Sequence, residues 1–277
     1  MKTKLLSPAD LGEYTHPAIV LFRSIELKCT YENTKGKKFR HPSLDLGSGD
    51  GYLASLLFDE KFTYGLDNGE ADDYQIAIDK DRYEKVLLES AEHMSLPDNY
   101  LQFVFCNSVI EHIPDNEAVL SEVARTLKKG GDFIFTSPSD NFKEYLYLSN
   151  IIESYGQIQF FSRWSPRIAK ALQNLASWYK NKRHAMLNHY HTLSHTEWQT
   201  RLKRHGLRMQ SYDYYISRDT CMFWDRLALQ VRFQSLLDKG ADAAALDDYR
   251  KTINEIYRTD SVKGTNGASL FIHAIKI

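Results

Sequence analysis

The sequence has few cysteines, no long apolar run and almost no net charge. Its three cysteines lack a metal-binding spacing, and their odd number fits a reducing compartment rather than a disulfide framework. No stretch approaches ~18 apolar residues, which argues against a membrane span, and the first residues do not resemble a signal peptide. The net charge of −1 gives no general attraction for nucleic acid. These absences predict a cytoplasmic globular protein without a nucleic-acid partner.

The most informative segment is HPSLDLGSGDGYLASLL at residues 41–57. It has the pattern of a short strand with Asp45, a turn with Gly47, Gly49 and Gly51, and an apolar helix. Glycines accept positive φ and let a ligand lie against the main chain. The first N–H groups of a helix suit a negatively charged group. The segment therefore predicts a nucleotide-type site at the carboxyl end of a parallel strand.

Two cofactor classes use such a turn. A dinucleotide fingerprint can be placed from Gly49 onward, but it leaves Asp45 and Gly47 without a role. The alternative pattern, apolar-Asp-apolar-Gly-x-Gly-x-Gly, is filled at every position and resembles motif I of the class I S-adenosylmethionine (SAM)-dependent methyltransferases. The resemblance implies that the glycine turn, with Ser48, approaches the methionine and ribose parts of SAM. It also implies that Asp45 orders the loop or reaches the SAM amino group through water.

The next strand, in FTYGLDNG, ends on Asp67, which is followed by Asn68. Asp67 lies 22 residues after Asp45, close to the ~20-residue interval expected for an acid that binds ribose hydroxyls. An ionised carboxylate only accepts hydrogen bonds, so it can take both hydroxyl protons. Asp67 and Asn68 are therefore predicted to contact the cofactor.

A third strand, KVLLES, leads into AEHMSLPDN. This stretch resembles the "(D/S)A-E…LP" segment that lies beside adenine in type 11 methyltransferases. The resemblance places Ser90 and Ala91 against the adenine. Because the spacing to the Leu-Pro pair is longer than usual, Glu89 or Glu92 is an alternative polar contact.

A fourth strand contains the apolar run 103–106 and reaches Asn107, which we include among the cofactor-binding residues. Apolar residues at helical spacing then predict a helix from Pro114 to Lys129, with Gly130 as its C-terminal cap. The whole block resembles the "V.EH…L.E..R.LK.GG" signature of the same family, including Glu111-His112.

Alternation of strands and helices predicts an α/β fold: a doubly wound, seven-stranded, mostly parallel, Rossmann-like methyltransferase sheet with helical insertions. We expect one domain over residues 1–277, with the resemblance firm over roughly 40–140. Its parts are a helical segment (1–40), a SAM-binding core (41–140), a helical lid insertion (141–190), a helix and strand (191–217), a helical insertion broken near Lys239-Gly240 (218–265) and a final antiparallel strand (266–277).

A strongly basic segment lies within this neutral chain. Between Arg163 and Arg208 there are ten Lys or Arg residues and one acid, Glu197, a net charge of +9. The pattern predicts a helix with one apolar face, formed by Ile168, Leu172, Leu175 and Tyr179. Three interpretations remain open: a solvated helix packed on the core, attraction of an anionic acceptor, and peripheral docking at an anionic membrane surface.

Several histidines fall in or near this segment. His189, His191 and His195 have neither a regular helical spacing nor accompanying carboxylates, so we predict no metal site. Instead, His191 is expected to reach from the lid border into the acceptor pocket. His112 is the second candidate catalytic residue, and a structural role at the following helix is its alternative. Either imidazole has a suitable pKa range for a general base.

The resemblance implies a SAM-dependent methyltransferase acting on a small-molecule acceptor, which the basic segment suggests is anionic. A lipid-linked or quinone-type acceptor at a membrane surface is the alternative. Two other classes remain open: a non-catalytic SAM-binding protein and a nucleotide-dependent oxidoreductase. The sequence does not choose between O-, N- and C-methylation.

Overall fold

The computed structural model describes residues 5–157, 165–235 and 241–277. Its centre is a seven-stranded sheet in the order β3-β2-β1-β4-β5-β7-β6, in which β7 is antiparallel to both of its neighbours and the other pairs are parallel. This confirms the predicted fold class. The strands are β1 (Ser43–Leu46), β2 (Phe62–Asp67), β3 (Tyr83–Leu88), β4 (Leu101–Asn107), β5 (Leu127–Pro138), β6 (Leu207–Tyr215) and β7 (Ser269–Lys276).

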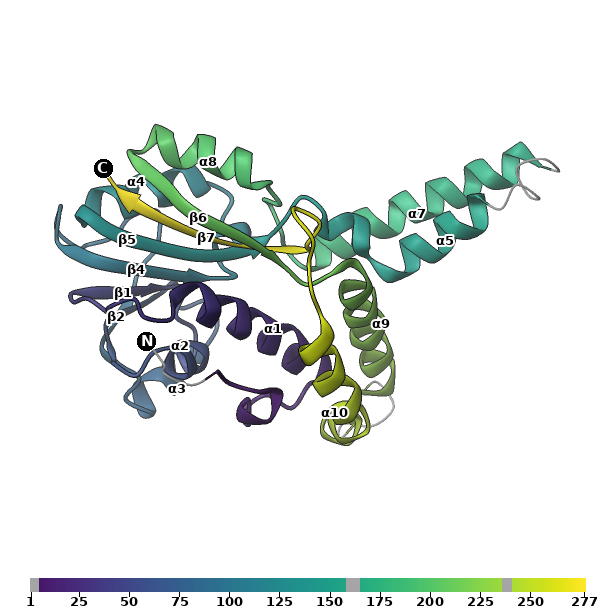
Figure 1. Ribbon diagram of the computed structural model, residues 1–277, viewed down its shortest axis with the longest axis horizontal. Coiled ribbons are helices and arrows are strands. Elements are labelled where there is room, and N and C mark those ends of the chain that lie inside the picture. Colours follow the sequence, from purple (N-terminus) through teal and green to yellow (C-terminus); the bar gives the residue numbers. More distant parts are fainter. Residues whose placement is uncertain (1–4, 158–164, 236–240) are drawn as a thin grey trace.

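Helices cover both faces of the sheet, and a pair of helices projects from one end (Figure 1). One face carries α4 and α8, the other carries α1 to α3, and the projecting pair is α5 and α7. No helix in the described part of the chain is both long and apolar enough to span a bilayer. The helices are α1 (Pro17–Thr34), α2 (Tyr52–Leu57), α3 (Asp73–Asp79), α4 (Asn116–Thr126), α5 (Tyr147–Gln157), α7 (Pro166–Met186), α8 (His195–Arg204), α9 (Arg218–Ser235) and α10 (Ala241–Thr259).

The central strand β4 is buried on both faces, as its apolar run predicts. Val104 packs into the core beneath α4 and α8, whereas Phe103 and Phe105 pack into the core beneath α1 and α2. Parallel strands flanked in this way all end at one edge of the sheet. The loops after β1, β2 and β4 therefore meet there.

The helix expected to run to Lys129 is shorter than predicted. α4 ends at Thr126, and β5 begins at Leu127, which pairs with Leu101 of β4. Lys128 and Lys129 are exposed residues of this strand, and Gly130, with φ +75°, lies inside it rather than capping a helix. Pairing with β4 and burial of Leu127 outweigh the helical periodicity of the sequence.

The apolar face predicted for the basic helix is also wrong in part. Ile168 and Leu175 of α7 are 48% and 47% exposed. The buried positions of the same helix include Lys180 and Arg183, at 8% and 7% exposure. Periodicity alone does not identify the inward face here because the residues that receive α7 carry acidic groups.

The second insertion forms two helices, α9 and α10, as predicted. The break expected near Lys239-Gly240 falls at 236–240, outside the described residues. The three cysteines are buried and form no disulfide.

Candidate functional site

Three glycines shape the loop between β1 and α2. Gly47, Gly49 and Gly51 have φ values of +73°, +48° and +72°, a region that favours glycine. A Cβ at Gly47 would lie 2.4 Å from the Val109 side chain, and one at Gly51 would lie 2.7 Å from the Tyr83 ring. A Cβ at Gly49 would meet nothing within 4 Å. Gly47 and Gly51 thus permit close packing, whereas Gly49 borders open space.

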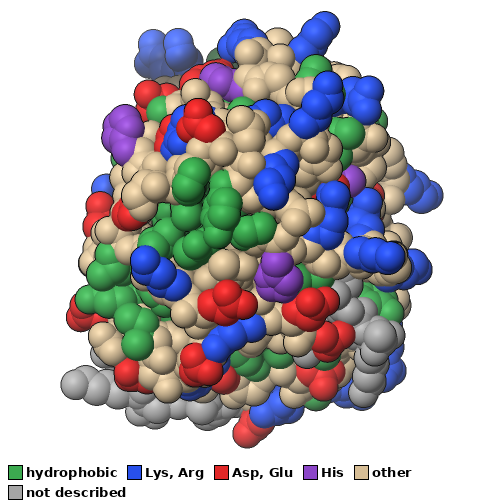
Figure 2. Space-filling model, turned by 90° about the vertical axis from the view of Figure 1, so that its left-hand side faces the viewer, with side chains coloured by type: hydrophobic (Ala, Val, Ile, Leu, Met, Phe, Trp, Pro, Cys, Tyr) green, Lys and Arg blue, Asp and Glu red, His purple; other side chains and the backbone are tan. Residues whose placement is uncertain are grey.

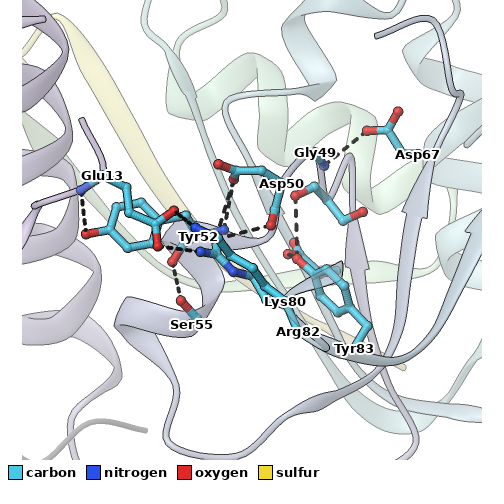
Figure 3. A network of polar contacts seen from close by, with 11 residues as sticks. Glu13, Gly49, Asp50, Tyr52, Ser55, Asp67, Lys80, Arg82 and Tyr83 are labelled. Carbon is cyan, nitrogen blue, oxygen red and sulfur yellow. Dashed lines mark hydrogen bonds and ion pairs between the residues drawn. The ribbon is translucent and has the colours of Figure 1, made fainter. Parts of the chain in front are cut away.

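Asp67, at the end of β2, fixes the middle of this loop. Its carboxylate accepts a hydrogen bond from the backbone N–H of Gly49 at 3.1 Å (Figure 3). It accepts a second one from the backbone N–H of Gly69 at 3.0 Å. On the other side of the loop, Arg82 donates to the Asp50 carbonyl at 3.1 Å and pairs with Glu13. The glycine loop is therefore held from both sides by charged groups.

Asp45 lies beneath the loop and is 5% exposed. The Tyr83 hydroxyl donates to its carboxylate at 2.6 Å. Burial raises the pKa of the Asp45 carboxyl to about 7, the Tyr83 hydrogen bond opposes this shift, and the charges of Asp67 and Asp50 add to it. These contacts are those expected of a residue that orders the loop.

A cavity of about 260 Å³ lies against the loop, and we call it the loop cavity. The Ser48 hydroxyl is buried there with no hydrogen-bond partner among the described residues. This orphaned oxygen and the space beside Gly49 suit a ligand with polar groups, as SAM has. Its lining includes five of the predicted residues: Asp45, Gly47, Ser48, Gly49 and Asn107.

Other predicted cofactor contacts lie outside the loop-cavity lining. Asn68 is exposed and accepts a hydrogen bond from the backbone of Glu70. Ser90 accepts one from the backbone of Glu92, and Ala91 packs in the hydrophobic core. Gly51 and Asp67 likewise support the loop without lining the cavity. The roles of these residues toward the cofactor stay predictions.

A second cavity, of about 330 Å³, adjoins the first. We call it the aromatic cavity. Both cavities include Tyr14, Arg23 and Ser108 in their linings, so they share a wall. The other lining residues of the aromatic cavity are Ile19, Phe22, Glu111, His112, Pro138, Phe142, Leu187, His189 and Trp224.

The two predicted catalytic histidines have different surroundings. His112 lines the aromatic cavity, its Nδ1 lies 3.1 Å from the Asn188 carbonyl, and burial lowers its pKa. His191 lies outside both linings, with its Nε2 2.9 Å from the Pro114 carbonyl. His189 occupies the place in the cavity wall that we expected for His191. His195 contacts the Tyr214 hydroxyl, so the three imidazoles considered together in the sequence do not form one cluster.

No sequence pattern indicated that α1 contributes to the site. Glu26 of this helix is fully buried and accepts hydrogen bonds from Arg23, Asn107 and Ser108, three residues that line the cavities. The bonds from Asn107 and Ser108 are 3.1 and 2.8 Å long. Glu26 thus holds Arg23 on the shared wall and connects α1 to the end of β4. Asn107 and Ser108 lie 81 and 82 residues after Glu26 in the sequence. No local motif therefore reveals these contacts.

Comparisons with known proteins agree with this geometry. Residues 44–135 match the family described as "Methyltransferase domain". A ubiquinone biosynthesis O-methyltransferase of Vibrio atlanticus is 30% identical over 132 residues, which cover 44% of this chain and 54% of the relative. The enzyme of that name from Klebsiella pneumoniae is 34% identical over 121 residues, covering 40% and 48%. The chain thus spans about half the length of these curated relatives.

A solved structure shows the same fold over nearly the whole chain. It is a SAM-dependent methyltransferase of Thermotoga maritima, with a TM-score of 0.56, 18% identity, and coverage of 98% of this chain and 97% of that one. The matched segment, residues 44–135, includes the glycine loop, Asp67 and the Glu111-His112 pair. Residues 44–135 therefore carry a domain that matches a methyltransferase family, and the chain as a whole has the fold of a SAM-dependent methyltransferase.

Proposed function

We propose that this protein transfers the methyl group of SAM to a small-molecule acceptor bound in the aromatic cavity. The observation that carries the proposal is the shared wall of the two cavities, formed by Tyr14, Arg23 and Ser108. A donor beside Gly49 and an acceptor beside Phe142 would lie on either side of this shared wall. The match to a methyltransferase family supports the loop cavity as the cofactor side.

The residues of the chain perform three tasks in this proposal. The Ser48 hydroxyl and the Asp67 carboxylate bind the cofactor, and SAM supplies an activated methyl group on its sulfonium. The aromatic side chains exclude water and hold the acceptor atom in line, at about 3 Å from the methyl carbon. Arg23 offers its guanidinium to a negatively charged group of either ligand.

Ligand-dependent thermal unfolding tests the cofactor side. SAM and S-adenosylhomocysteine should raise the melting temperature by selective binding to the folded state, and NAD and NADP should not. A shift with NAD alone would favour the oxidoreductase alternative. Turnover is then tested with methyl-labelled SAM and a panel of phenols, amines and carboxylates. SAM binding without transfer to any compound of the panel would favour the non-catalytic alternative.

A lipid-linked or quinone-type acceptor is a second candidate, favoured by the exposed side chains of α7. Trp178 is 61% exposed, Ile168 and Leu175 are about half exposed, and Arg167 and Lys170 are exposed beside them. Apolar and basic groups together suit an anionic membrane surface. The face shown in Figure 2, which is opposite the projecting pair α5 and α7, instead intersperses acidic and basic side chains among hydrophobic patches, with the clearest patch near its centre. The matched relatives named for ubiquinone biosynthesis are consistent with an apolar acceptor.

Vesicle co-sedimentation tests this second candidate. We expect binding to anionic vesicles and not to neutral ones, and we expect the double variant Arg167→Gln/Lys170→Gln to weaken it. Each basic residue near such a surface contributes about 1 kcal/mol, so the pair should account for roughly a 30-fold loss. The matched control is Lys128→Gln/Lys129→Gln, which removes two exposed lysines of β5. Equal losses in both double variants would contradict docking through α7.

A further inference from the structure

Three potential metal ligands meet in the wall of the aromatic cavity. The ligand atoms of Glu111, His112 and His189 all lie within 4.8 Å of one another. The Oε1 atom of Glu111 is 3.8 Å from Nε2 of His112. All three residues line the cavity. Two imidazoles and one carboxylate are a donor set that Zn²⁺ and related divalent ions accept.

A second observation points to a ligand at this place. Glu111 is 1% exposed, and its Oε2 atom has no hydrogen-bond partner among the described residues. Burying such an oxygen without compensation is unfavourable, so native structures rarely leave one without a partner. The guanidinium of Arg23, which lines the same cavity, is already paired with Glu26. A cation between the Glu111 carboxylate and the two imidazoles would supply the missing partner.

The backbone holds the cluster together. The carbonyl oxygen of Glu111 accepts a hydrogen bond from the Tyr190 N–H at 2.8 Å, which brings the 188–191 segment against Ile110–His112. Nδ1 of His112 lies 3.1 Å from the Asn188 carbonyl. Since only a protonated nitrogen can donate to a carbonyl, the ring then carries its lone pair on Nε2, the atom nearer to Glu111. Histidine ligands of metals are commonly oriented by such a hydrogen bond.

We propose that Glu111, His112 and His189 bind a divalent transition-metal ion whose open coordination position faces the aromatic cavity. Metal–ligand bonds of about 2.0–2.1 Å in a tetrahedral site place ligand atoms about 3.3 Å apart, so side-chain rotations of the three residues complete the site. Three protein ligands leave one position for an exogenous oxygen.

The site would also define the acceptor chemistry, a step that rests on the proposed methyl transfer. An acceptor hydroxyl bound at the open position loses its proton to water more readily, because the cation stabilises the oxyanion. The oxygen then forms the bond to the methyl carbon while the carbon–sulfur bond of the donor breaks. The imidazole of His112 serves as a ligand in this scheme, and no protein base is required.

Metal binding by the full-length protein tests the proposal. When Zn²⁺ is titrated in competition with a chromophoric chelator, the protein should bind one equivalent of the ion with high affinity. Co²⁺ bound in its place should give the d–d absorption band of a site with imidazole ligands. Glu111→Gln and His189→Gln should each weaken binding at least about tenfold, since even outer-shell partners of metal ligands account for about 10–100-fold. His191→Gln and His195→Gln, which alter nearby imidazoles outside the cluster, are the matched controls and should keep the affinity.

Absence of a stoichiometric site would overturn the proposal, as would equal loss in the control variants. Retained affinity in Glu111→Gln and His189→Gln would overturn it as well. Circular dichroism of each variant verifies folding, and Glu111→Gln preserves the volume of the buried side chain. Thermal shift with SAM on the same samples separates the two proposals, because the loop cavity does not include Glu111 or His189. Metal binding without methyl transfer would count against the proposed function alone.

Discussion

The glycine loop and α7 both contain charged residues, and they use them differently. Around the loop, Asp67 and Arg82 bond to backbone groups of the loop itself, the N–H of Gly49 and the carbonyl of Asp50. In α7, Lys180 and Arg183 pair with acids from other elements, Glu144 and Asp225. A charge in the loop therefore orders a binding surface. A charge in α7 attaches a helix to the protein.

This difference changes how the basic segment is interpreted. Its net charge of +9 suggested one electrostatic surface, but the structure divides it. Arg183 and Lys180 are buried and paired, and Arg201 and Arg204 lie near Glu117. Arg167, Lys170 and Lys182 remain exposed. Among the described residues, Lys203 and Arg208 are exposed as well, and this exposed set is the one suited to attract an anionic partner.

The largest effect is expected from Arg183→Gln. The Nε atom of Arg183 lies 2.8 Å from Oδ1 of Asp225, whose side chain is fully buried. Removing the cation leaves a buried carboxylate whose remaining partners among the described residues are the Tyr179 hydroxyl and the Tyr147 N–H. Breaking a buried pair in this way costs about 3–5 kcal/mol. Urea unfolding should show that loss, whereas the exposed control Lys182→Gln should change stability by less than about 0.5 kcal/mol.

Substitution of Gly49 should have the next largest effect, on the cofactor. A leucine there would project into open space at the loop cavity, so the thermal shift with SAM should disappear. Gly36→Leu is the control for backbone strain, because Gly36 also has positive φ and open surroundings but lies away from the cavity. A normal SAM shift in Gly49→Leu would show that the loop is not the cofactor site.

Asp67→Ala should lower SAM affinity at least about tenfold. Each hydrogen bond to a charged group contributes ~1.5–3 kcal/mol, and ~1.4 kcal/mol corresponds to tenfold. Because Asp67 also holds the Gly49 N–H, calorimetry should include an S-adenosylhomocysteine analogue without ribose hydroxyls. If Asp67 contacts the ribose, the substitution should weaken binding of the analogue less than binding of S-adenosylhomocysteine. Equal losses of affinity for the two ligands would assign Asp67 to loop support alone.

The smallest effect concerns pH and Asp45. Burial raises its folded-state pKa from an unfolded value of 3.8 to about 7, so the folded protein binds more protons between these limits. Its contribution to stability is present below pH ~4 and is lost as the pH rises toward ~7. Asp45→Asn cannot ionise, and its amide oxygen still accepts from Tyr83. The melting temperature of the variant should rise relative to that of the wild type between pH 5 and pH 8. A difference between the two melting temperatures that stays constant over this range would contradict the raised pKa of Asp45.

Much of the sheet was predictable because its signals are local. The run of glycines after Asp45 and the strand end at Asp67 each depend on residues a few positions apart. Predictions failed where tertiary pairing competes with a local pattern. Leu127 belongs to β5 because β4 offers it hydrogen bonds and a buried place, although its spacing fits α4 equally well.

The sequence by itself determined the resemblance to methyltransferases over residues 44–135, the doubly wound sheet and the position of the glycine loop. These features depend on hydrophobic periodicity and on glycines that lie close together in the sequence. Only the tertiary structure decided which side chains face a ligand. In the structure, Arg23 and Glu26 of α1 lie beside Ser108, and His189 rather than His191 lines the aromatic cavity. These contacts join residues about 80 positions apart, such as Glu26 with Ser108 and His112 with Asn188. Such pairs are fixed by the packing of whole elements, and no periodicity along the chain records them.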